Sequence, residues 1–212
     1  MNILYLCDEY PPGPHGGIGT AVRLLAREMA KQGHCVVVAG LYTLGYGGED
    51  EFVDGGVRVY RFRMGWDSRL LVNERSVITR GVKKLLKYSG LMQRDIRKSL
   101  SKFHVKLEQL IAEHRIDIVE MPDYNDYIRF CSSTVPFPKL SVPVIVKLHG
   151  SLTYFAREAN KDVPRQVFEM EKAILGQATA VSAVSRYTAQ KCAVYFGYDK
   201  PIAVLYNGID TS

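Results

Sequence analysis

Short apolar runs alternate along the chain with longer stretches in which apolar residues recur every three or four positions. The short runs have the near-continuous Val, Ile, Leu and Ala content of strands that are buried on both faces. They span residues 2–7, 35–40, 57–63, 116–121, 143–149, 178–185 and 202–207. Strands that alternate with helices form βαβ units. The pattern therefore predicts an α/β fold with a doubly wound, mostly parallel, Rossmann-like sheet flanked by helices.

The first helical pattern follows the first strand directly. Its apolar residues Ile18, Val22, Leu25 and Met29 share one helix face. Gly33 is the expected C′ residue that ends this helix. The glycine-rich, acidic stretch 41–56 is expected to form a surface loop or a hairpin before the strand at 57–63.

The length and composition fit one folded domain over residues 1–212. The apolar fraction of 47% supports a real core, and no apolar run approaches the roughly 18 residues that cross a bilayer. The apolar N-terminus has no basic region before it and is interpreted as a strand rather than a signal peptide. Four widely spaced cysteines without a CxxC pair indicate a reducing, cytoplasmic compartment.

Positive charge is concentrated in one segment. Residues 69–106 carry a local balance of +9, although the whole chain has a net charge of +6. Apolar residues from Ile78 to Leu110 fall on one helix face, and Lys and Arg fall toward the opposite face. Gly81 and Gly90 leave open whether this is one helix or two with a break near residues 89–90. The basic face that would meet a membrane or another anionic partner includes Arg80, Lys83, Lys84 and Lys87.

A glycine-rich loop, "DEYPPGPHGGIGT", joins the first strand to the first helix. It has no Gly-Lys-Ser/Thr ending, so it is not a P-loop, and Val22 stands where a dinucleotide fingerprint has its third glycine. A helix that begins near Ile18 presents unpaired backbone N–H groups and the positive end of its dipole. Gly16, Gly17 and Gly19 would let a phosphate, another anion or a sugar hydroxyl approach that backbone. The alternative is a tight turn that needs glycine only for its backbone conformation.

A second candidate group follows later strands. "KLHGS" places His149 directly after a buried strand. Ligands of doubly wound sheets bind outside the carboxyl ends of the strands, so several loops should meet at one rim. The residues expected there are Gly16, Gly17, Glu120, Asp123, His149 and Ser185. The turns that carry Gly17 and His149 are expected to leave neighbouring parallel strands.

Four segments, in order, resemble the N-terminal half of a family 4 glycosyltransferase, a retaining class with the two-domain GT-B fold. They are "DEYPPGPHGGIGTAVRLLAREMAKQGHCVVV", "IDIVEMPDY", "VKLHGS" and "AVSAVSRYTAQKC…VLYNGID". The resemblance covers nearly the whole chain. It implies a Rossmann-like, acceptor-side domain of an enzyme that transfers a sugar from a nucleotide-sugar to a saccharide or lipid-linked acceptor.

The resemblance also implies roles for individual residues. Gly16, Gly17 and Gly19 match the loop near the donor phosphates and the acceptor, and His149 matches the histidine at the reacting centre. Glu120 and Asp123 resemble acidic residues near the acceptor, where carboxylates suit a polyol. Tyr124 is a further acceptor-binding candidate, because its ring could stack on a sugar. From the residues alone, the alternatives are that His149 caps the turn after its strand and that Asp123 caps a helix. No metal and no cofactor beyond the donor substrate is expected.

The chain departs from the family pattern in its extent. The two glutamates separated by seven residues that mark the donor-binding half occur nowhere in it. A C-terminal donor-binding domain is therefore expected to be absent from these 212 residues, and the fragment is expected to be inactive alone. The competing hypothesis is a non-catalytic basic module that binds anionic membrane surfaces, such as the inner face of the cell membrane, or other anionic partners. Nucleic-acid binding is not expected, because no recognised motif accompanies the charge.

Overall fold

The computed structural model describes residues 1–42, 46, 48–64 and 90–209. Its strands form one sheet in the order β3-β4-β2-β1-β5-β6-β7-β8. They are β1 (Asn2–Leu6), β2 (Cys35–Tyr42), β3 (Glu51–Asp54), β4 (Val57–Arg63), β5 (Ile118–Pro122), β6 (Val144–Leu148), β7 (Ala180–Ala183) and β8 (Ile202–Val204). Every strand predicted from the apolar runs is present. All pairings are parallel except that of β3 with β4, which confirms the predicted fold class.

The glycine-rich stretch before β4 does contain a hairpin. Strand β3 pairs with β4 through a two-residue turn at Gly55 and Gly56, whose φ values are 61° and 88°. Positive φ at both central residues is the geometry of a type I′ turn, which matches the twist of the flanking strands. The antiparallel β3 therefore forms the edge of an otherwise parallel sheet.

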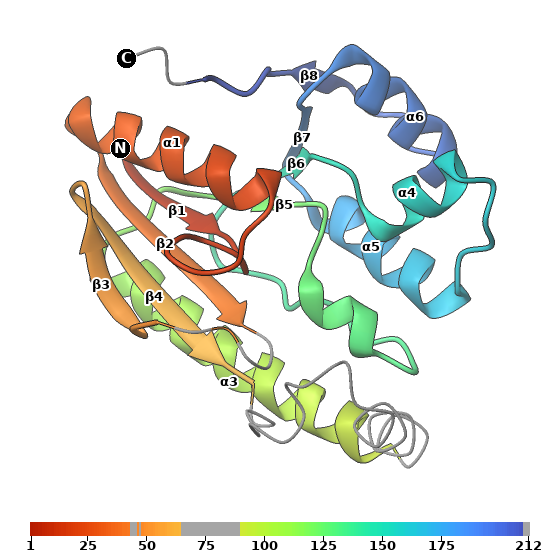
Figure 1. Cartoon of the computed structure of the whole chain (residues 1–212), viewed down its shortest axis with the longest axis horizontal. Helices are drawn as coiled ribbons and strands as arrows, with labels where there is room; N and C mark the ends of the chain where they lie inside the picture. The colour runs from red at the N-terminus through yellow and green to blue at the C-terminus, as the bar shows by residue number, and fades with distance from the viewer. Residues whose placement is uncertain (43–45, 47, 65–89, 210–212) are drawn as a thin grey trace.

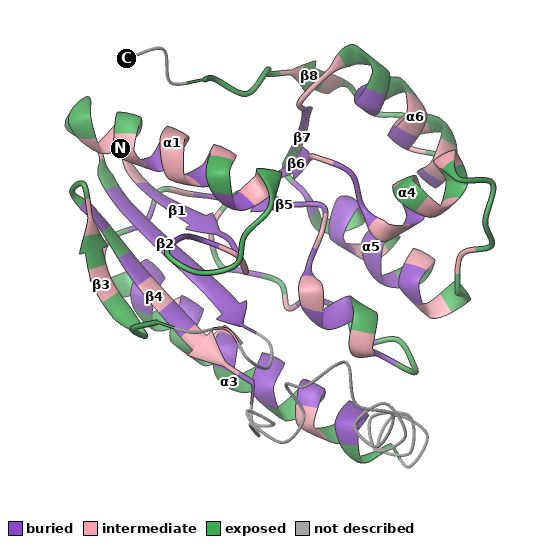
Figure 2. Cartoon of the chain, viewed as in Figure 1, coloured by how far each residue is buried: buried purple, intermediate pink, exposed green. Residues whose placement is uncertain are grey.

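The helices form layers on the two faces of the sheet (Figure 1). They are α1 (Gly17–Lys31), α3 (Leu91–Glu113), α4 (Leu152–Glu158), α5 (Arg165–Gln177) and α6 (Arg186–Phe196), with a 3₁₀ turn, η2 (Asp126–Phe130). Helix α1 packs on one face over β1, β2 and β4, and α3, α5 and α6 contribute to the core of the other face. The strands in the middle of the sheet are buried on both sides (Figure 2).

Helix α1 begins and ends as its sequence predicts. Val22 is buried, and Ile18, Leu25 and Met29 pack against the same core cluster. Gly33 has a φ of 87°, and its N–H donates to Ala30 O while His34 N–H donates to Met29 O. This pair of hydrogen bonds is a Schellman motif, which satisfies the last carbonyls of the helix.

Of the basic segment 69–106, the structure describes residues 90–106, and helix α3 contains residues 91–106 of it. It starts after Gly90, which has a φ of 76°, so a helix boundary does occur at the predicted break. The predicted apolar stripe from Met92 to Leu110 is buried, and Lys98, Lys102 and Lys106 are exposed. Arg80, Lys83, Lys84 and Lys87 lie outside the described residues. No described helix combines the length and apolar content that a membrane crossing requires.

Parallel pairing places the ends of β1, β5, β6 and β7 along the same carboxyl edge of the sheet, as predicted. The expectation that Gly17 and His149 follow neighbouring strands was wrong. Strand β5 lies between β1, which precedes the glycine loop, and β6, which precedes His149. The chain enters β5 through the long crossover helix α3, and β5 pairs with both strands because its apolar residues complete the core between them.

Candidate functional site

The amides of the glycine-rich loop are bound by a side chain of the same loop. Gly16 N–H donates to Glu9 Oε2 at 3.1 Å, and Gly19 N–H donates to Glu9 Oε1 at 2.8 Å. A carboxylate at a helix N-terminus is favourable because it satisfies free N–H groups and meets the positive end of the dipole. Glu9 therefore binds two of the backbone N–H groups that were expected to be free for a ligand. No pattern in the sequence singled out Glu9.

The three glycines of this loop serve different purposes. A Cβ on Gly19 would lie 2.2 Å from the backbone oxygen of Glu9, so Gly19 allows α1 to pack against the preceding loop. A Cβ on Gly16 would lie 3.3 Å from Glu9 Oε2. A Cβ on Gly17 would meet no atom within 4 Å. Of the three, Gly17 is the one whose backbone faces open space, where a ligand can approach it.

Asp8, at the end of β1, ties three loops together. Its carboxylate accepts hydrogen bonds from Leu41 N–H at 3.0 Å and from Asp126 N–H at 3.2 Å. Burial raises the pKa of Asp8 to about 7, against the opposing effect of the Leu41 hydrogen bond. Asp8 therefore connects the ends of β1 and β2 to the loop after β5. No sequence motif marks Asp8, because its partners are backbone groups from distant parts of the chain.

Asp123 has the same function after β5. The residue is 3% exposed, and its carboxylate accepts His149 N–H at 2.8 Å and Gly150 N–H at 3.2 Å. Burial raises the pKa of Asp123 to about 7. Asp123 therefore holds the backbone of His149 at the rim.

A third carboxylate fixes the start of α4. Glu171, a residue of α5 that is 2% exposed, accepts hydrogen bonds from Leu152 N–H at 2.8 Å and Thr153 N–H at 3.0 Å. Burial raises the pKa of Glu171. Ser151 also caps α4, since its Oγ accepts Tyr154 N–H at 3.2 Å. The segment that follows His149 is thus held on both sides.

His149 itself is half-buried at the carboxyl end of β6. Burial, and then the nearby Lys147 ammonium, lower the pKa of His149 to about 4. The imidazole is therefore neutral at pH 7, with one ring nitrogen as a donor and the other as an acceptor. A neutral imidazole can donate a hydrogen bond to a sugar hydroxyl through one ring nitrogen or accept one through the other.

A pocket of about 260 Å³ opens on the rim between the glycine loop and the loop after β5. It lies where β1 is flanked by β2 on one side and β5 on the other, which is the switch point of this sheet. Its lining residues are Asp8, Glu9, Pro14, Ile18, Tyr46, Pro122, Tyr124, Asp126 and Arg129. Tyr124 Oη donates to Asp126 Oδ1 at 3.2 Å, and Arg129 Nη1 donates to the same oxygen at 2.9 Å. Oxygen and nitrogen groups thus converge on a space of the size of a small polyol.

The other predicted residues lie in different places. Glu120 is inside β5, in register with Tyr5 on β1, and so belongs to the α1-side face of the sheet rather than to this pocket. Burial raises the pKa of Glu120, and the Lys147 ammonium opposes that shift. Ser185 caps α6, because its Oγ accepts Thr188 N–H at 3.0 Å. Of the three predicted acceptor residues, Tyr124 lines the rim pocket, and Glu120 and Asp123 are not among its lining residues.

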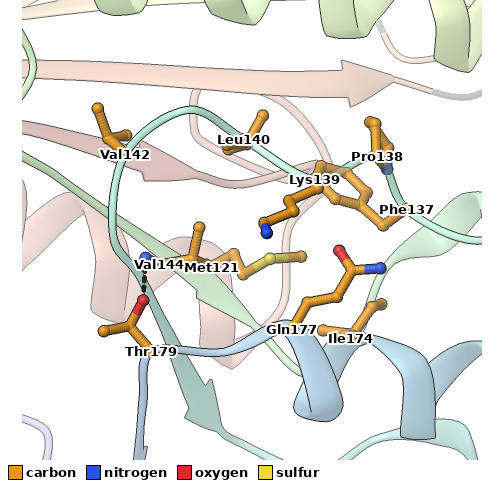
Figure 3. A pocket seen from close by; sticks show the side chains of 10 residues that line it. All are labelled: Met121, Phe137, Pro138, Lys139, Leu140, Val142, Val144, Ile174, Gln177 and Thr179. Carbon is orange, nitrogen blue, oxygen red and sulfur yellow. Dashed lines mark hydrogen bonds between the residues drawn. The ribbon is translucent and has the colours of Figure 1, made fainter.

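Other hollows lie away from the rim. The pocket in Figure 3 holds about 70 Å³ and lies beside the first residue of β6, Val144, and Thr179, just before β7. These residues stand at the amino edge of the sheet, opposite His149 and Gly17. Wider grooves run beside α1 and beside α3. The rim pocket is smaller than these grooves, but it lies at the switch point beside β1, which is where doubly wound α/β proteins bind ligands. Within the described residues, no cluster of three or more His, Cys, Asp or Glu side chains is arranged to hold a metal ion.

The family model for glycosyltransferase family 4 matches residues 15–212. The chain belongs to glycosyltransferase family 4. The match begins in the glycine loop and includes α1, the loop after β5 and His149, and the pocket residues Asp8, Glu9 and Pro14 precede it. The family resemblance seen in the sequence is confirmed.

Solved structures show the same fold. Sucrose-phosphate synthase from Thermosynechococcus elongatus superposes with a TM-score of 0.64 over 97% of this chain, at 13% identity. The chain spans 48% of that structure. A shorter form of the same synthase superposes with a TM-score of 0.51 at 14% identity, with 100% of this chain and 90% of the other covered. No match to a curated protein was found by sequence.

Proposed function

We propose that the chain is the acceptor-side domain of a retaining glycosyltransferase. The enzyme would transfer a sugar from a nucleotide-sugar to a saccharide or lipid-linked acceptor in the cytoplasm. The rim pocket at the switch point supports this proposal most directly. It lies between the glycine loop and the loop after β5, and it is lined by groups that can bind hydroxyls. The family membership supplies the reaction class.

In this proposal the acceptor lies in the rim pocket. Tyr124 and the Asp126–Arg129 pair offer donors and acceptors to its hydroxyl groups. Gly17 faces open space at the start of α1, where its backbone can approach the donor phosphates. Neutral His149 contacts the donor sugar and stabilises it by hydrogen bonding as the glycosidic bond to phosphate breaks. In a retaining reaction of this type the leaving phosphate accepts the proton of the attacking hydroxyl.

We further propose that transfer requires a second, donor-binding domain. The nucleotide would bind between the two domains, so the 212-residue chain should be inactive alone. The test is to assay this chain alone and as a joined protein, in which the donor-binding domain of a family 4 glycosyltransferase follows Ser212, with a panel of nucleotide-sugars. Transfer by the joined protein and not by the chain supports the proposal. Absence of transfer or donor hydrolysis in both would contradict it.

His149 provides the sharper test in the joined protein. His149→Ala should lower kcat/KM at least about tenfold, which corresponds to about 1.4 kcal/mol of transition-state stabilisation. His34→Ala is the matched control, because His34 precedes β2 at the opposite edge of the sheet. Equal activity of the two variants would show that His149 is structural.

The basic face of α3 supports a second function, peripheral binding to anionic lipid. Lys98, Lys102 and Lys106 follow each other at four-residue spacing beside a groove of about 450 Å³ that Arg63 also lines. Phe62 and Phe103 lie below them, with ring centroids 5.3 Å apart. An apolar floor under a row of lysines suits an anionic amphiphile.

Vesicle sedimentation tests this second function. Changing Lys98, Lys102 and Lys106 to Glu should abolish binding to vesicles that contain phosphatidylserine. A control with Lys31, Lys161 and Lys200 changed to Glu has the same net charge on other exposed positions. Binding that is equal in both variants, or that does not depend on anionic lipid, would exclude this role for α3.

A further inference from the structure

Arg61 is a buried cation two strands away from the glycine loop. It lies on β4, and β2 separates β4 from β1. The residue is 3% exposed, although arginine is among the residues that are almost never fully buried without partners. Its contacts explain why the fold keeps a guanidinium there.

The guanidinium binds the backbone of the loop that follows β1. Arg61 Nη2 donates to Tyr10 O at 2.8 Å and to Pro12 O at 2.7 Å. Both carbonyls belong to the stretch between Asp8 and the first glycines of α1. A charged donor makes hydrogen bonds that are about twice as strong as neutral ones. Arg61 therefore fixes the path of residues 10–12.

Aromatic rings hold the guanidinium in place. Its central carbon lies 5.3 Å from the ring centroid of Tyr42, 5.1 Å from that of Tyr46 and 4.7 Å from that of Phe52. These distances fall within the range of cation–π attraction, which is stronger when the cation is desolvated. Tyr46 Oη also donates to Tyr10 O at 2.9 Å, so one carbonyl receives two hydrogen bonds. The planar fork of arginine suits this arrangement and the ammonium of lysine does not.

The segment that Arg61 fixes adjoins Glu9, which packs against and hydrogen-bonds the glycines at the start of α1. Gly19 packs so closely on Glu9 O that a Cβ would overlap it, and Glu9 Oε1 and Oε2 accept the N–H groups of Gly19 and Gly16. Glu9 is adjacent to Tyr10, whose carbonyl Arg61 holds. A displacement of Tyr10 would therefore move the backbone and the carboxylate on which the first turn of α1 rests.

We propose that Arg61 is a positioning residue for sugar transfer: through Tyr10 and Glu9 it holds Gly16, Gly17 and Gly19 in the conformation that meets the donor. The proposal rests on the proposed function for its last step. Its first step, the ordering of the loop, can be measured without any activity.

Hydrogen exchange tests the first step in the 212-residue chain. In Arg61→Met the amides of Gly16 and Gly19 should exchange about tenfold faster than in the wild-type chain, and in Arg61→Lys they should show an intermediate rate. Arg58→Met is the control, because Arg58 is an exposed arginine of the same strand. Equal rates at Gly16 and Gly19 in wild type and Arg61→Met would overturn the proposal.

Kinetics of the joined protein test the last step. Arg61→Met should lower kcat/KM for transfer about tenfold at a temperature where its unfolding curve shows it fully folded, and Arg61→Lys should restore part of that loss. Unchanged kinetics with faster exchange would overturn the role in transfer. Absence of transfer by the wild-type protein would instead contradict the proposed function, and the exchange rates would still decide whether Arg61 orders the loop.

Discussion

The carboxylate of Asp123 accepts the backbone N–H of His149 at 2.8 Å, across 26 residues of sequence. Gly150 N–H donates to both oxygens of the same carboxylate, at 3.3 and 3.2 Å. Asp123 is the first residue after β5, and His149 is the first residue after β6. The hydrogen bonds therefore join two adjacent rim loops at the point where the predicted catalytic side chain leaves the sheet.

Removal of the Asp123 carboxylate should release the His149 loop. Asp123→Ala leaves the buried Gly150 N–H and the part-buried His149 N–H without this acceptor, and a buried group that loses its partner costs about 1–3 kcal/mol in the free energy of unfolding. Asp123→Asn retains an acceptor oxygen and should lose much less. Urea denaturation of the three proteins measures the difference. A loss in Asp123→Asn as large as that in Asp123→Ala would mean that the negative charge, and not the acceptor, holds the loop.

Alanine substitutions should separate the roles of two glycines in the same turn of α1. Gly19→Ala places a methyl group 2.2 Å from Glu9 O and should lower the free energy of unfolding by about 2 kcal/mol or more. Gly17→Ala meets open space and should leave stability equal or slightly higher, since alanine favours helix. Thermal and urea unfolding of both variants test this. In the joined protein Gly17→Ala should nevertheless raise the KM for the donor, because the methyl group stands where the ligand approaches.

His149 should titrate far below an ordinary histidine. Its pKa is lowered from 6.5 to about 4 in the folded chain. Between pH 6.5 and 4 the unfolded chain binds a proton at His149 and the folded chain does not. The stability that neutral His149 contributes is therefore fully present above pH 6.5 and is lost as the pH falls from 6.5 through 4. NMR titration of the imidazole carbons should therefore show no protonation of His149 at pH 6. A midpoint near 6.5 would contradict the buried, neutral form.

Glu9 should stabilise α1 by its charge and by its two hydrogen bonds. Glu9→Ala removes both acceptors from the Gly16 and Gly19 amides and should lower the free energy of unfolding by about 0.5–2 kcal/mol. Glu9→Gln keeps one acceptor oxygen and should fall between that variant and the wild type. The series is measured by urea denaturation at low salt. Glu28→Ala, later in the same helix, is the control and should change stability little, because Glu28 forms an exposed ion pair with Lys31.

Much of the architecture follows from local patterns. The apolar runs identify β1, β2 and β4 to β8, and the stripe Ile18, Val22, Leu25 and Met29 identifies the buried face of α1. Gly33 follows the end of α1, as its residue type predicts. These features could be predicted because burial and capping depend on residues that are near each other in sequence.

The partners of the rim residues could not be predicted in this way. Sequence reasoning selected the glycine loop, Asp123, Tyr124 and His149, but it missed Asp8, Glu9 and Arg61. Glu120 was expected at the rim, and it lies within β5 instead. A carboxylate or guanidinium that binds backbone groups leaves no motif, since any residue can provide an N–H or a carbonyl.

By itself the sequence determined the α/β class, the strands and the family, because these follow from apolar periodicity and from glycine and histidine at fixed places along the chain. Only the tertiary structure decided that β5 separates β1 from β6, that Glu9 accepts the N–H groups at the start of α1 and that Arg61 binds the carbonyls of the loop after β1. The reason is physical: strand order and buried hydrogen bonds are set by long-range packing and by the need to satisfy every buried polar group, and these depend on the whole fold.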